Sequence, residues 1–144
     1  MNQRPRILFL CTGNACRSQM AESWARHLFG ERIEACSAGV APHAVDARAV
    51  VVMREAGIDI GGNRSKHVDT LLDTPFDVVV TVCDHAAEVC PLFSGTLRRL
   101  HHSFDDPPKL AQSALSEDEA LPHYRRVRDE IHAFILTLPQ LIRD

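Results

Sequence analysis

Residues 6–30 constrain the fold most, because a strand, a loop and a helix follow one another there without a break. Ile7-Leu-Phe-Leu10 is a continuous apolar run, which is typical of a strand buried on both faces. A polar loop of mostly small residues follows at positions 11–18 (Cys-Thr-Gly-Asn-Ala-Cys-Arg-Ser). Ser18 can cap a predicted helix that runs to about Phe29 and stops at Gly30. A buried strand that leads through a short loop into a helix is the start of a parallel α/β unit.

The remaining sequence continues this alternation. Strand patterns cover residues 33–37, 76–82 and 97–104. Asp46 is in position to cap a second helix, which runs through Ala56 and is closed by Gly57. The side chains expected to face inward from this helix are Ala49, Val50, Met53 and Ala56.

The last third of the chain is predicted to contain a loop and a long helix. Residues 105–108 (Asp-Asp-Pro-Pro) are expected to form the loop, because two prolines cannot continue a strand or a helix. Ser116 and Glu119 have the spacing of a capping box, although Pro122 favours a helix that starts there. The helix carries an apolar stripe of Tyr124, Val127, Ile131, Phe134, Ile135 and Leu138.

Together these elements predict one domain over residues 1–144, an open parallel sheet of four strands with helices on both faces. Ligands of such sheets bind beyond the carboxyl ends of the strands. Three segments begin at strand ends: the loop after Leu10, the residues after Val82 and the acidic loop after Phe104. We therefore expect these segments to share one rim, and the functional residues to lie there.

The loop at residues 11–18 combines a thiol with a guanidinium. It can curl so that successive backbone N–H groups point at one tetrahedral oxyanion, while Arg17 holds two of the anion's oxygens. The same positive field favours the thiolate of Cys11, a candidate nucleophile to which Ser18 can donate a hydrogen bond. Gly13 permits a close approach and Asn14 a left-handed conformation. The predicted oxyanion-binding residues are Thr12, Gly13, Asn14, Ala15, Cys16, Arg17 and Ser18. The alternative interpretation is a buried structural cysteine beside a surface arginine.

Asp105 and Asp106 offer a proton donor at the same rim. Attack of a thiolate on a phosphate-like centre expels an oxygen, and a protonated carboxyl can supply the proton. Crowding beside a bound anion raises the pKa of an aspartate and so helps to keep it protonated. Pro107 stiffens the loop, which favours Asp106 as this acid. Without the cysteine loop, a solvated turn would be the better interpretation of Asp before Pro.

Cys83 and Cys90 decide between functions. In a helix their spacing places them roughly 10 Å apart, whereas a disulfide needs Cα atoms about 4.4–6.8 Å apart. A bond between them requires this segment to unwind, which suits a redox relay better than a structural staple. Two unrelated cysteines are the alternative. We interpret Cys16 and Cys36 as packing residues.

Composition limits the class of partner. The formal net charge of −3 argues against a general nucleic-acid surface, and no apolar run is long enough to span a membrane. Five cysteines fit no secreted disulfide framework, and no Cys/His group has the spacing of zinc ligands. We therefore expect a cytoplasmic protein, most simply a monomer, with no metal site.

The chain resembles the thioredoxin-coupled arsenate reductases, which share the fold of the low-molecular-weight tyrosine phosphatases. The resemblance rests on motifs in the expected order along nearly the whole chain: residues 11–22, 37–39, 57–60, 83–91, 104–107 and 125–130. A Cys-x5-Arg loop alone fits a phosphatase or a reductase. The pair of Cys83 and Cys90 is specific to the reductases, and Gln19 stands where the phosphatases usually carry proline.

The resemblance implies a reaction. Cys11 attacks arsenate held by Arg17 and the loop amides, and Asp106 protonates the departing oxygen. Cys83 then attacks Cys11, which releases arsenite and forms a transient Cys11–Cys83 disulfide. Cys90 moves the disulfide to Cys83–Cys90, where thioredoxin reduces it. Two thiols supply the two electrons that convert As(V) to As(III), so no bound cofactor is needed; the implied role is arsenic detoxification, and phosphate or sulfate can occupy the same site.

Two other functions and one departure from the family stay open. A phosphatase would act through a phospho-Cys11 intermediate resolved by water, and an oxyanion-sensing regulator would bind the anion without turnover. Some members bind potassium with residues that match Asn14, Glu22, Ser37 and an aspartate where this chain has Lys66. We hypothesise that the Lys66 ammonium replaces that ion and can pair with Glu22; an ordinary solvated lysine is the alternative.

Overall fold

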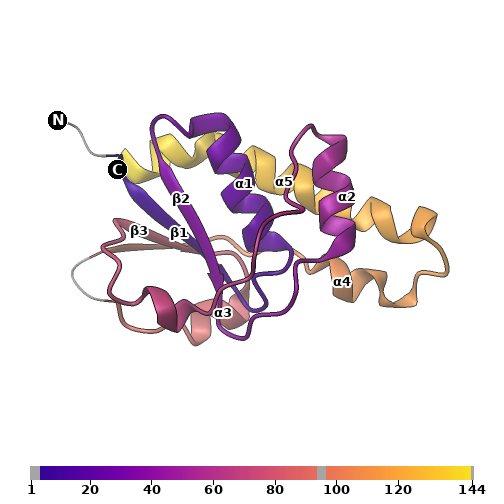
Figure 1. Cartoon of the computed structure of the whole chain (residues 1–144), viewed down its shortest axis with the longest axis horizontal. Helices are drawn as coiled ribbons and strands as arrows, with labels where there is room; N and C mark the ends of the chain where they lie inside the picture. The colour runs from indigo at the N-terminus through magenta and orange to yellow at the C-terminus, as the bar shows by residue number, and fades with distance from the viewer. Residues whose placement is uncertain (1–3, 94–96, 144) are drawn as a thin grey trace.

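The computed structural model describes residues 4–93 and 97–143. Four strands form one parallel sheet in the order β2-β1-β3-β4: β1 (Arg6–Cys11), β2 (Glu34–Gly39), β3 (Val78–Thr81) and β4 (Arg98–His101). The helices alternate with these strands or follow them (Figure 1): α1 (Arg17–Phe29), α2 (Ala47–Glu55), α3 (Asp84–Glu88), α4 (Pro107–Leu110) and α5 (Glu117–Arg143). The predicted four-stranded parallel sheet is confirmed.

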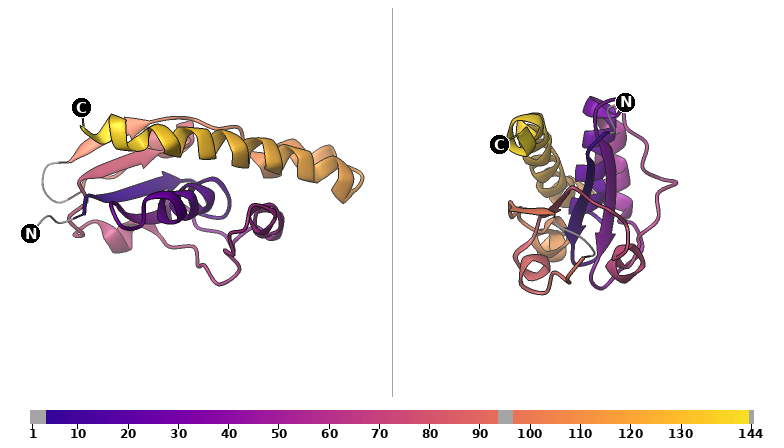
Figure 2. Two further views of the ribbon diagram at one scale, coloured as in Figure 1. Left: turned by 90° about the horizontal axis from the view of Figure 1, so that it is seen from above. Right: turned by 90° about the vertical axis from the view of Figure 1, so that its left-hand side faces the viewer.

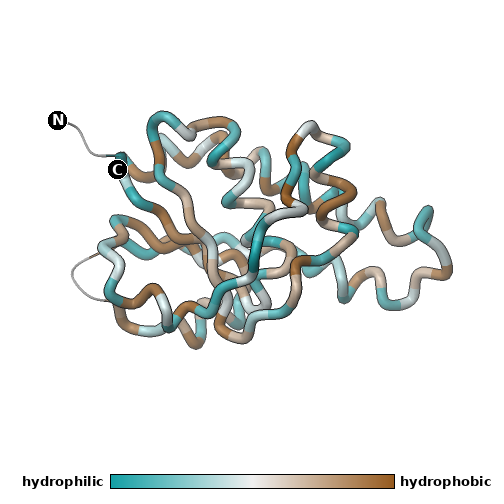
Figure 3. Tube along the Cα trace, viewed as in Figure 1, coloured by the Kyte–Doolittle hydropathy of each residue, from teal (hydrophilic) through white to brown (hydrophobic). Residues whose placement is uncertain are grey.

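Helices bury the centre of the sheet. Neither β1 nor β3 has an exposed residue, which agrees with their continuous apolar sequences. The helix α1 packs on β1 and β2 and against α5, whereas α3 packs on β1 and β3. Figure 2 shows α5 extending along almost the full length of the molecule, and the hydrophobic stretches of the trace in Figure 3 include β1 and β3. All six residues of the predicted stripe on α5 are buried: Tyr124, Val127, Ile131, Phe134, Ile135 and Leu138.

Both ends of α2 follow the sequence prediction. The Asp46 side chain accepts a hydrogen bond from the backbone N–H of Arg48 at 2.8 Å, and Gly57 adopts a φ of 87° just beyond the helix, a conformation that favours glycine. Ala49 and Met53 are buried as expected, but the third buried residue is Val52 instead of Val50.

Three local predictions are wrong. Pro107 and Pro108 begin α4 instead of prolonging a loop, because the first turn of a helix needs no N–H donor. The helix α5 starts at Glu117 and passes through Pro122, since the Ser116 hydroxyl accepts from the Glu119 N–H at 3.3 Å and caps the helix there. The Glu119 carboxylate accepts from the Leu115 N–H at 2.6 Å, one residue before the partner that a capping box uses. The strands β3 and β4 are also shorter than the patterns at 76–82 and 97–104, because the chain turns out of the sheet toward α3 and α4.

The carboxyl ends of the strands meet at one edge, as predicted. Cys11 at the end of β1 is in register with Gly39, and Thr81 at the end of β3 is in register with Leu10 and His101. The loop after Cys11, the start of α3 and the acidic segment before α4 all leave from this edge. Within the described part of the chain, no helix has both the length and the hydropathy that a membrane span requires.

Truncation of the α5 stripe is expected to destabilise the whole domain. Ile131 has no exposed surface, so Ile131→Ala should lower the free energy of unfolding by about 2–5 kcal/mol. The matched control is Leu136→Ala on the same helix, where the side chain is 52% exposed and the change should stay within about 0.5 kcal/mol. Urea denaturation followed by circular dichroism measures both; equal effects would contradict the packing described for α5.

Candidate active site

Every carbonyl of residues 11–16 is hydrogen-bonded to a flanking group. The segment at residues 40–46 runs alongside the loop and donates backbone N–H groups to the carbonyls of Cys11, Thr12, Gly13 and Ala15 at 2.8–3.2 Å. The Asn14 carbonyl accepts from the side chains of Gln19 and Ser65, and that of Cys16 accepts from the N–H of Met20 in α1. With the carbonyls engaged in this way, the inside of the turn is left to backbone N–H groups, which is the arrangement of a loop that can bind an anion.

Asn14 is the internal brace of the loop. It has a φ of 49°, a left-handed conformation that asparagine tolerates, and is fully buried. Its Oδ1 accepts from the backbone N–H of Lys66 at 2.8 Å, and its Nδ2 donates to the Ser18 hydroxyl at 2.8 Å. The Asn14 side chain therefore connects the loop to the 65–67 segment on one side and to α1 on the other.

The Cys11 sulfur is surrounded by donors. The backbone N–H of Asn14 lies 3.2 Å from it and the Ser18 hydroxyl 2.8 Å from it. When Cys11 is a thiolate it can only accept, so the Ser18 hydroxyl donates to the sulfur while accepting from the Asn14 amide. The predicted capping role of Ser18 is wrong: α1 starts at Arg17 with Cys16 at its N-cap, and the Ser18 hydroxyl is directed to the sulfur.

Arg17 lies between the loop and the acidic segment. One guanidinium nitrogen donates to the Phe104 carbonyl at 2.9 Å, and the other lies 3.7 Å from an Asp106 carboxyl oxygen. The Arg17 side chain is 13% exposed and that of Asp106 40% exposed. Asp105 instead pairs with Arg126 at 2.9 Å. Of the two carboxyl groups, that of Asp106 thus lies beside Arg17; its role as a proton donor stays a prediction.

Cys83 lies at the edge of the loop. Its sulfur is 3.4 Å from the Thr12 hydroxyl, and Cys83 is the N-cap residue of α3. A cleft of about 660 Å³ opens here, and its lining includes Thr12, Arg17, Cys83, Phe104 and Asp106. Cys11 itself is 3% exposed. The structure thus brings together the residues that the sequence predicts to share one rim.

The other three cysteines differ in position. Cys90 follows α3 and is partly exposed, and all five thiols are free. Cys16 is buried, and burial raises the pKa of its thiol well above the ordinary value, with a further increase from the Asp46 carboxylate. Burial, followed by the charge of Glu22, also raises the pKa of Cys36. Neutral thiols agree with the packing roles predicted for Cys16 and Cys36.

Lys66 does not pair with Glu22. The Glu22 carboxylate accepts from the Ser37 hydroxyl at 2.9 Å and pairs with Arg26 at 3.3 Å. The Lys66 ammonium instead donates to the Arg64 carbonyl at 3.2 Å. The cation that neutralises Glu22 is therefore a guanidinium one helical turn away on α1, and the expected Lys66–Glu22 pair is wrong.

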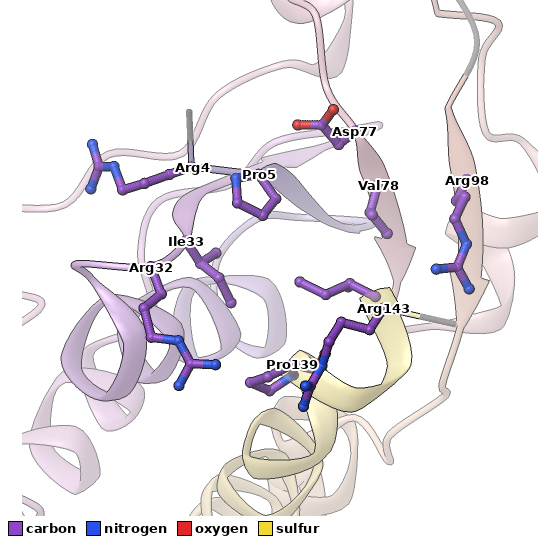
Figure 4. Close-up of a pocket in the computed structure, with 10 residues that line it drawn as sticks. Arg4, Pro5, Arg32, Ile33, Asp77, Val78, Arg98, Pro139 and Arg143 are labelled. Carbon is purple, nitrogen blue, oxygen red and sulfur yellow. The ribbon is translucent and has the colours of Figure 1, made fainter. Parts of the chain in front are cut away.

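A second cavity, of about 640 Å³, lies at the opposite edge of the sheet. Figure 4 shows it between the start of β1, the start of β3 and the end of α5, with Arg32, Arg98 and Arg143 around it. It shares no residue with the cleft beside Cys83. Across residues 4–93 and 97–143, no group of three or more His, Cys, Asp or Glu side chains is arranged to hold a metal ion.

The family model for the low molecular weight phosphotyrosine protein phosphatases matches residues 6–142. The chain belongs to this family. An arsenate reductase of Halalkalibacterium halodurans is 45% identical over 134 residues, which are 93% of this chain and 94% of that protein. Relatives with this name confirm the resemblance seen in the sequence.

Solved structures of arsenate reductases share this fold. An arsenate reductase in the phosphate binding state superposes with a TM-score of 0.78 at 27% identity, covering 96% of this chain and 98% of that one. A thioredoxin-dependent arsenate reductase of Corynebacterium glutamicum superposes with a TM-score of 0.72 over 99% of this chain and 63% of that one. The sequence identity to this second structure is 24%, so the comparison with it supports the fold of this chain alone.

Sequence reasoning missed the residues that hold the loop from outside. A Cβ atom on Gly39 would lie 2.6 Å from the Thr12 carbonyl oxygen and 2.8 Å from the Asn14 nitrogen, so only glycine lets β2 approach the loop this closely. The Tyr124 hydroxyl donates to Asp46 at 2.7 Å, which links α5 to the segment that binds the loop carbonyls. A glycine at the end of a strand pattern was the available signal for the first, but no pattern indicated the second.

Adding a methyl group at Gly39 is expected to displace the loop. Gly39→Ala should destabilise the protein by about 1–3 kcal/mol, because the new contacts are with backbone atoms, and it should weaken the binding of inorganic phosphate. Gly62→Ala is the matched control, since nothing lies within 4 Å of its Cβ position. Isothermal titration calorimetry with phosphate measures the affinity; unchanged binding in Gly39→Ala would contradict the close approach.

The buried Cys16 thiol is expected to make the fold sensitive to alkali. Its folded-state pKa is raised, so the unfolded chain loses this proton first, above about pH 8.5, and stability falls as the pH rises. Cys16→Ala should therefore reduce the loss of unfolding free energy per pH unit by up to about 1.4 kcal/mol. Urea denaturation of both proteins at several pH values up to about 10 gives the slopes; identical slopes would refute the assignment.

Proposed function

We propose that this protein reduces arsenate to arsenite through a relay of Cys11, Cys83 and Cys90. The observation that carries the proposal is the contact of 3.4 Å between the Cys83 sulfur and the Thr12 hydroxyl, because it leaves a second thiol at the mouth of a pocket already built for a nucleophilic sulfur and an oxyanion. A phosphatase needs the pocket but not the second thiol. The 45% identity to an arsenate reductase supports the same assignment.

In the first step, the Cys11 thiolate attacks arsenate. The loop amides and Arg17 hold the oxygens of the anion, and Asp106 donates a proton to the oxygen that leaves as water. The product is an ester in which the Cys11 sulfur is bonded to As(V). The hydrogen bonds of Asn14 and Ser18 to the sulfur support its role as the thiolate nucleophile.

In the second step, Cys83 attacks the Cys11 sulfur. The S–S bond forms, the S–As bond breaks, and its electron pair stays on arsenic, which leaves as arsenite in the As(III) state. Two thiols are oxidised and one arsenic is reduced by two electrons, so the step balances without a bound cofactor. The Thr12 hydroxyl can donate to the Cys83 sulfur as it loses its proton.

In the third step, Cys90 attacks Cys83 and releases Cys11. The disulfide moves to Cys83–Cys90, toward the more exposed thiol, where a dithiol protein of the thioredoxin type can reduce it by exchange. Such a reductant belongs to the cytoplasm, where free thiols persist. This is the location we propose.

The second candidate function is hydrolysis of a phosphate monoester. The family to which the chain belongs takes its name from this activity, and phosphate has the shape and charge of arsenate. Water would then resolve a phospho-Cys11 intermediate, and neither Cys83 nor Cys90 would be required. A weak phosphatase activity is compatible with the reductase; a phosphatase independent of both thiols, without arsenate turnover, is not.

The relay predicts which cysteines turnover requires. With thioredoxin, thioredoxin reductase and NADPH, arsenate-dependent oxidation of NADPH should fall to background in Cys83→Ser and in Cys90→Ser. Cys36→Ser is the matched control and should keep the parent rate, because the Cys36 thiol has a raised pKa and lies outside the cleft. Cys90→Ser with one equivalent of arsenate should accumulate the Cys11–Cys83 disulfide, which peptide mass spectrometry detects.

Each other outcome points to another function. Full turnover of arsenate by Cys90→Ser would exclude the relay. Hydrolysis of p-nitrophenyl phosphate at the parent rate by both serine variants, with no arsenate reduction by the parent, would establish the phosphatase. Binding of arsenate without turnover would indicate an oxyanion sensor.

A further inference from the structure

Two polar contacts hold the segment around α3 against β4. At its start, Asp84 accepts from the His101 ring nitrogen Nε2 at 2.9 Å. At its end, a guanidinium nitrogen of Arg99 lies 2.9 Å from the Cys90 sulfur. Arg99 and His101 are two positions apart on the strand, so their side chains leave the same face of the sheet. The lining of a cavity of about 160 Å³ includes Cys90, Arg99 and His101.

Both terminal nitrogens of the Arg99 guanidinium contact the end of this segment. One nitrogen, Nη1, contacts the Cys90 sulfur, and the other, Nη2, donates to the Pro91 carbonyl at 3.3 Å. Throughout residues 4–93 and 97–143, no carboxylate lies within ion-pair distance of Arg99. The sulfur of Cys90 is therefore the atom toward which this positive charge is directed.

We infer that Arg99 prepares Cys90 as the nucleophile of the last thiol–disulfide exchange. The inference rests on the proposed relay and adds a residue that the three-cysteine scheme does not contain. A guanidinium donates a charge-assisted hydrogen bond to a thiolate, which is stronger than a bond between neutral groups. The second bond to the Pro91 carbonyl keeps the sulfur at a defined position on the face of β4.

The exchange that Arg99 serves balances without another reactant. The Cys90 thiolate attacks the Cys83 sulfur of the Cys11–Cys83 disulfide, the new S–S bond forms, and the old one breaks with its electron pair on Cys11. Cys11 leaves as a thiolate and is received by the Asn14 N–H and the Ser18 hydroxyl. The negative charge thus moves from the Cys90 sulfur, beside Arg99, to the Cys11 sulfur in the loop.

The same contact releases the disulfide once it has formed. A disulfide sulfur carries no charge and is a weaker acceptor than a thiolate, so Arg99 loses its charge-assisted partner when Cys83–Cys90 closes. The end of the segment is then held to β4 by weaker contacts, and the disulfide becomes open to an external dithiol. Arg99 therefore favours the attack of Cys90 and does not hold its product.

The test follows the two disulfides separately in time. The full-length protein reacts with one equivalent of arsenate without reductant, is quenched with acid, and is analysed by peptide mass spectrometry. In Arg99→Met, the Cys11–Cys83 disulfide should form at the parent rate, while its conversion to Cys83–Cys90 should slow about 10- to 100-fold, the effect of losing one charge-assisted hydrogen bond. Arg99→Lys keeps the charge and should recover part of the rate.

Arg98→Met is the matched control. Arg98 is the preceding residue of β4, so its side chain leaves the opposite face, and it lines the distant cavity of Figure 4. It should convert the disulfide at the parent rate. Parent-like conversion in Arg99→Met, or equal slowing of both steps with a lower melting temperature, would overturn the inference. A parent protein that forms no Cys83–Cys90 disulfide would refute the relay itself, which is a separate result.

Discussion

The structure of the site depends on where the loop carbonyls go. A turn that surrounds an anion must keep its carbonyl oxygens away from the negative charge. Here the 40–46 segment binds four of those oxygens, Gln19 and Ser65 bind a fifth, and α1 binds the sixth. As a consequence, the backbone N–H of Asn14 and the Cys11 sulfur share the inside of the turn, where the proposed function places the oxyanion.

This arrangement requires elements that are distant in the sequence. The 40–46 segment is in place because β2 pairs with β1 as far as Gly39, and the Tyr124 hydroxyl on α5 holds Asp46 where it can also bind Ala15. Burial raises the pKa of Tyr124 far above its ordinary value, and the bond to Asp46 adds to this, so its hydroxyl stays a donor at physiological pH. The active loop is thus braced by the core helix.

Local sequence patterns predicted most of the helices and strands and the position of the cysteine loop. The apolar run before Cys11, the Asp46 cap and the stripe on α5 each express a local preference that the tertiary structure keeps. The errors occur where two local signals compete. At Pro122, a proline suggested a helix start, but the Ser116 cap begins the helix five residues earlier, at Glu117. At Ser18, a hydroxyl suited to capping contacts the Cys11 sulfur instead.

Contacts across the sheet carried no such signal. The sequence around Arg99 is typical of an exposed edge strand. Its neighbour Arg98 is also an arginine, but its side chain leaves the opposite face of the sheet. Only the parallel pairing of β4 with β3 brings Arg99 beside a cysteine nine residues earlier in the chain. The same holds for Gly39, whose missing side chain matters because the backbone of the loop after β1 lies against it.

The short length of α3 is compatible with the thiol–disulfide exchange that the proposed relay requires. Cys83 and Cys90 flank five helical residues, and a disulfide between them requires this turn to open. So short a helix has little stability of its own, and Cys83 at its N-cap makes no capping bond with its side chain. Its position comes largely from packing and from contacts with β4. The proposed relay requires this segment to open while the sheet and the loop after β1 stay intact, and a helix this short, without a side-chain cap, is suited to that requirement.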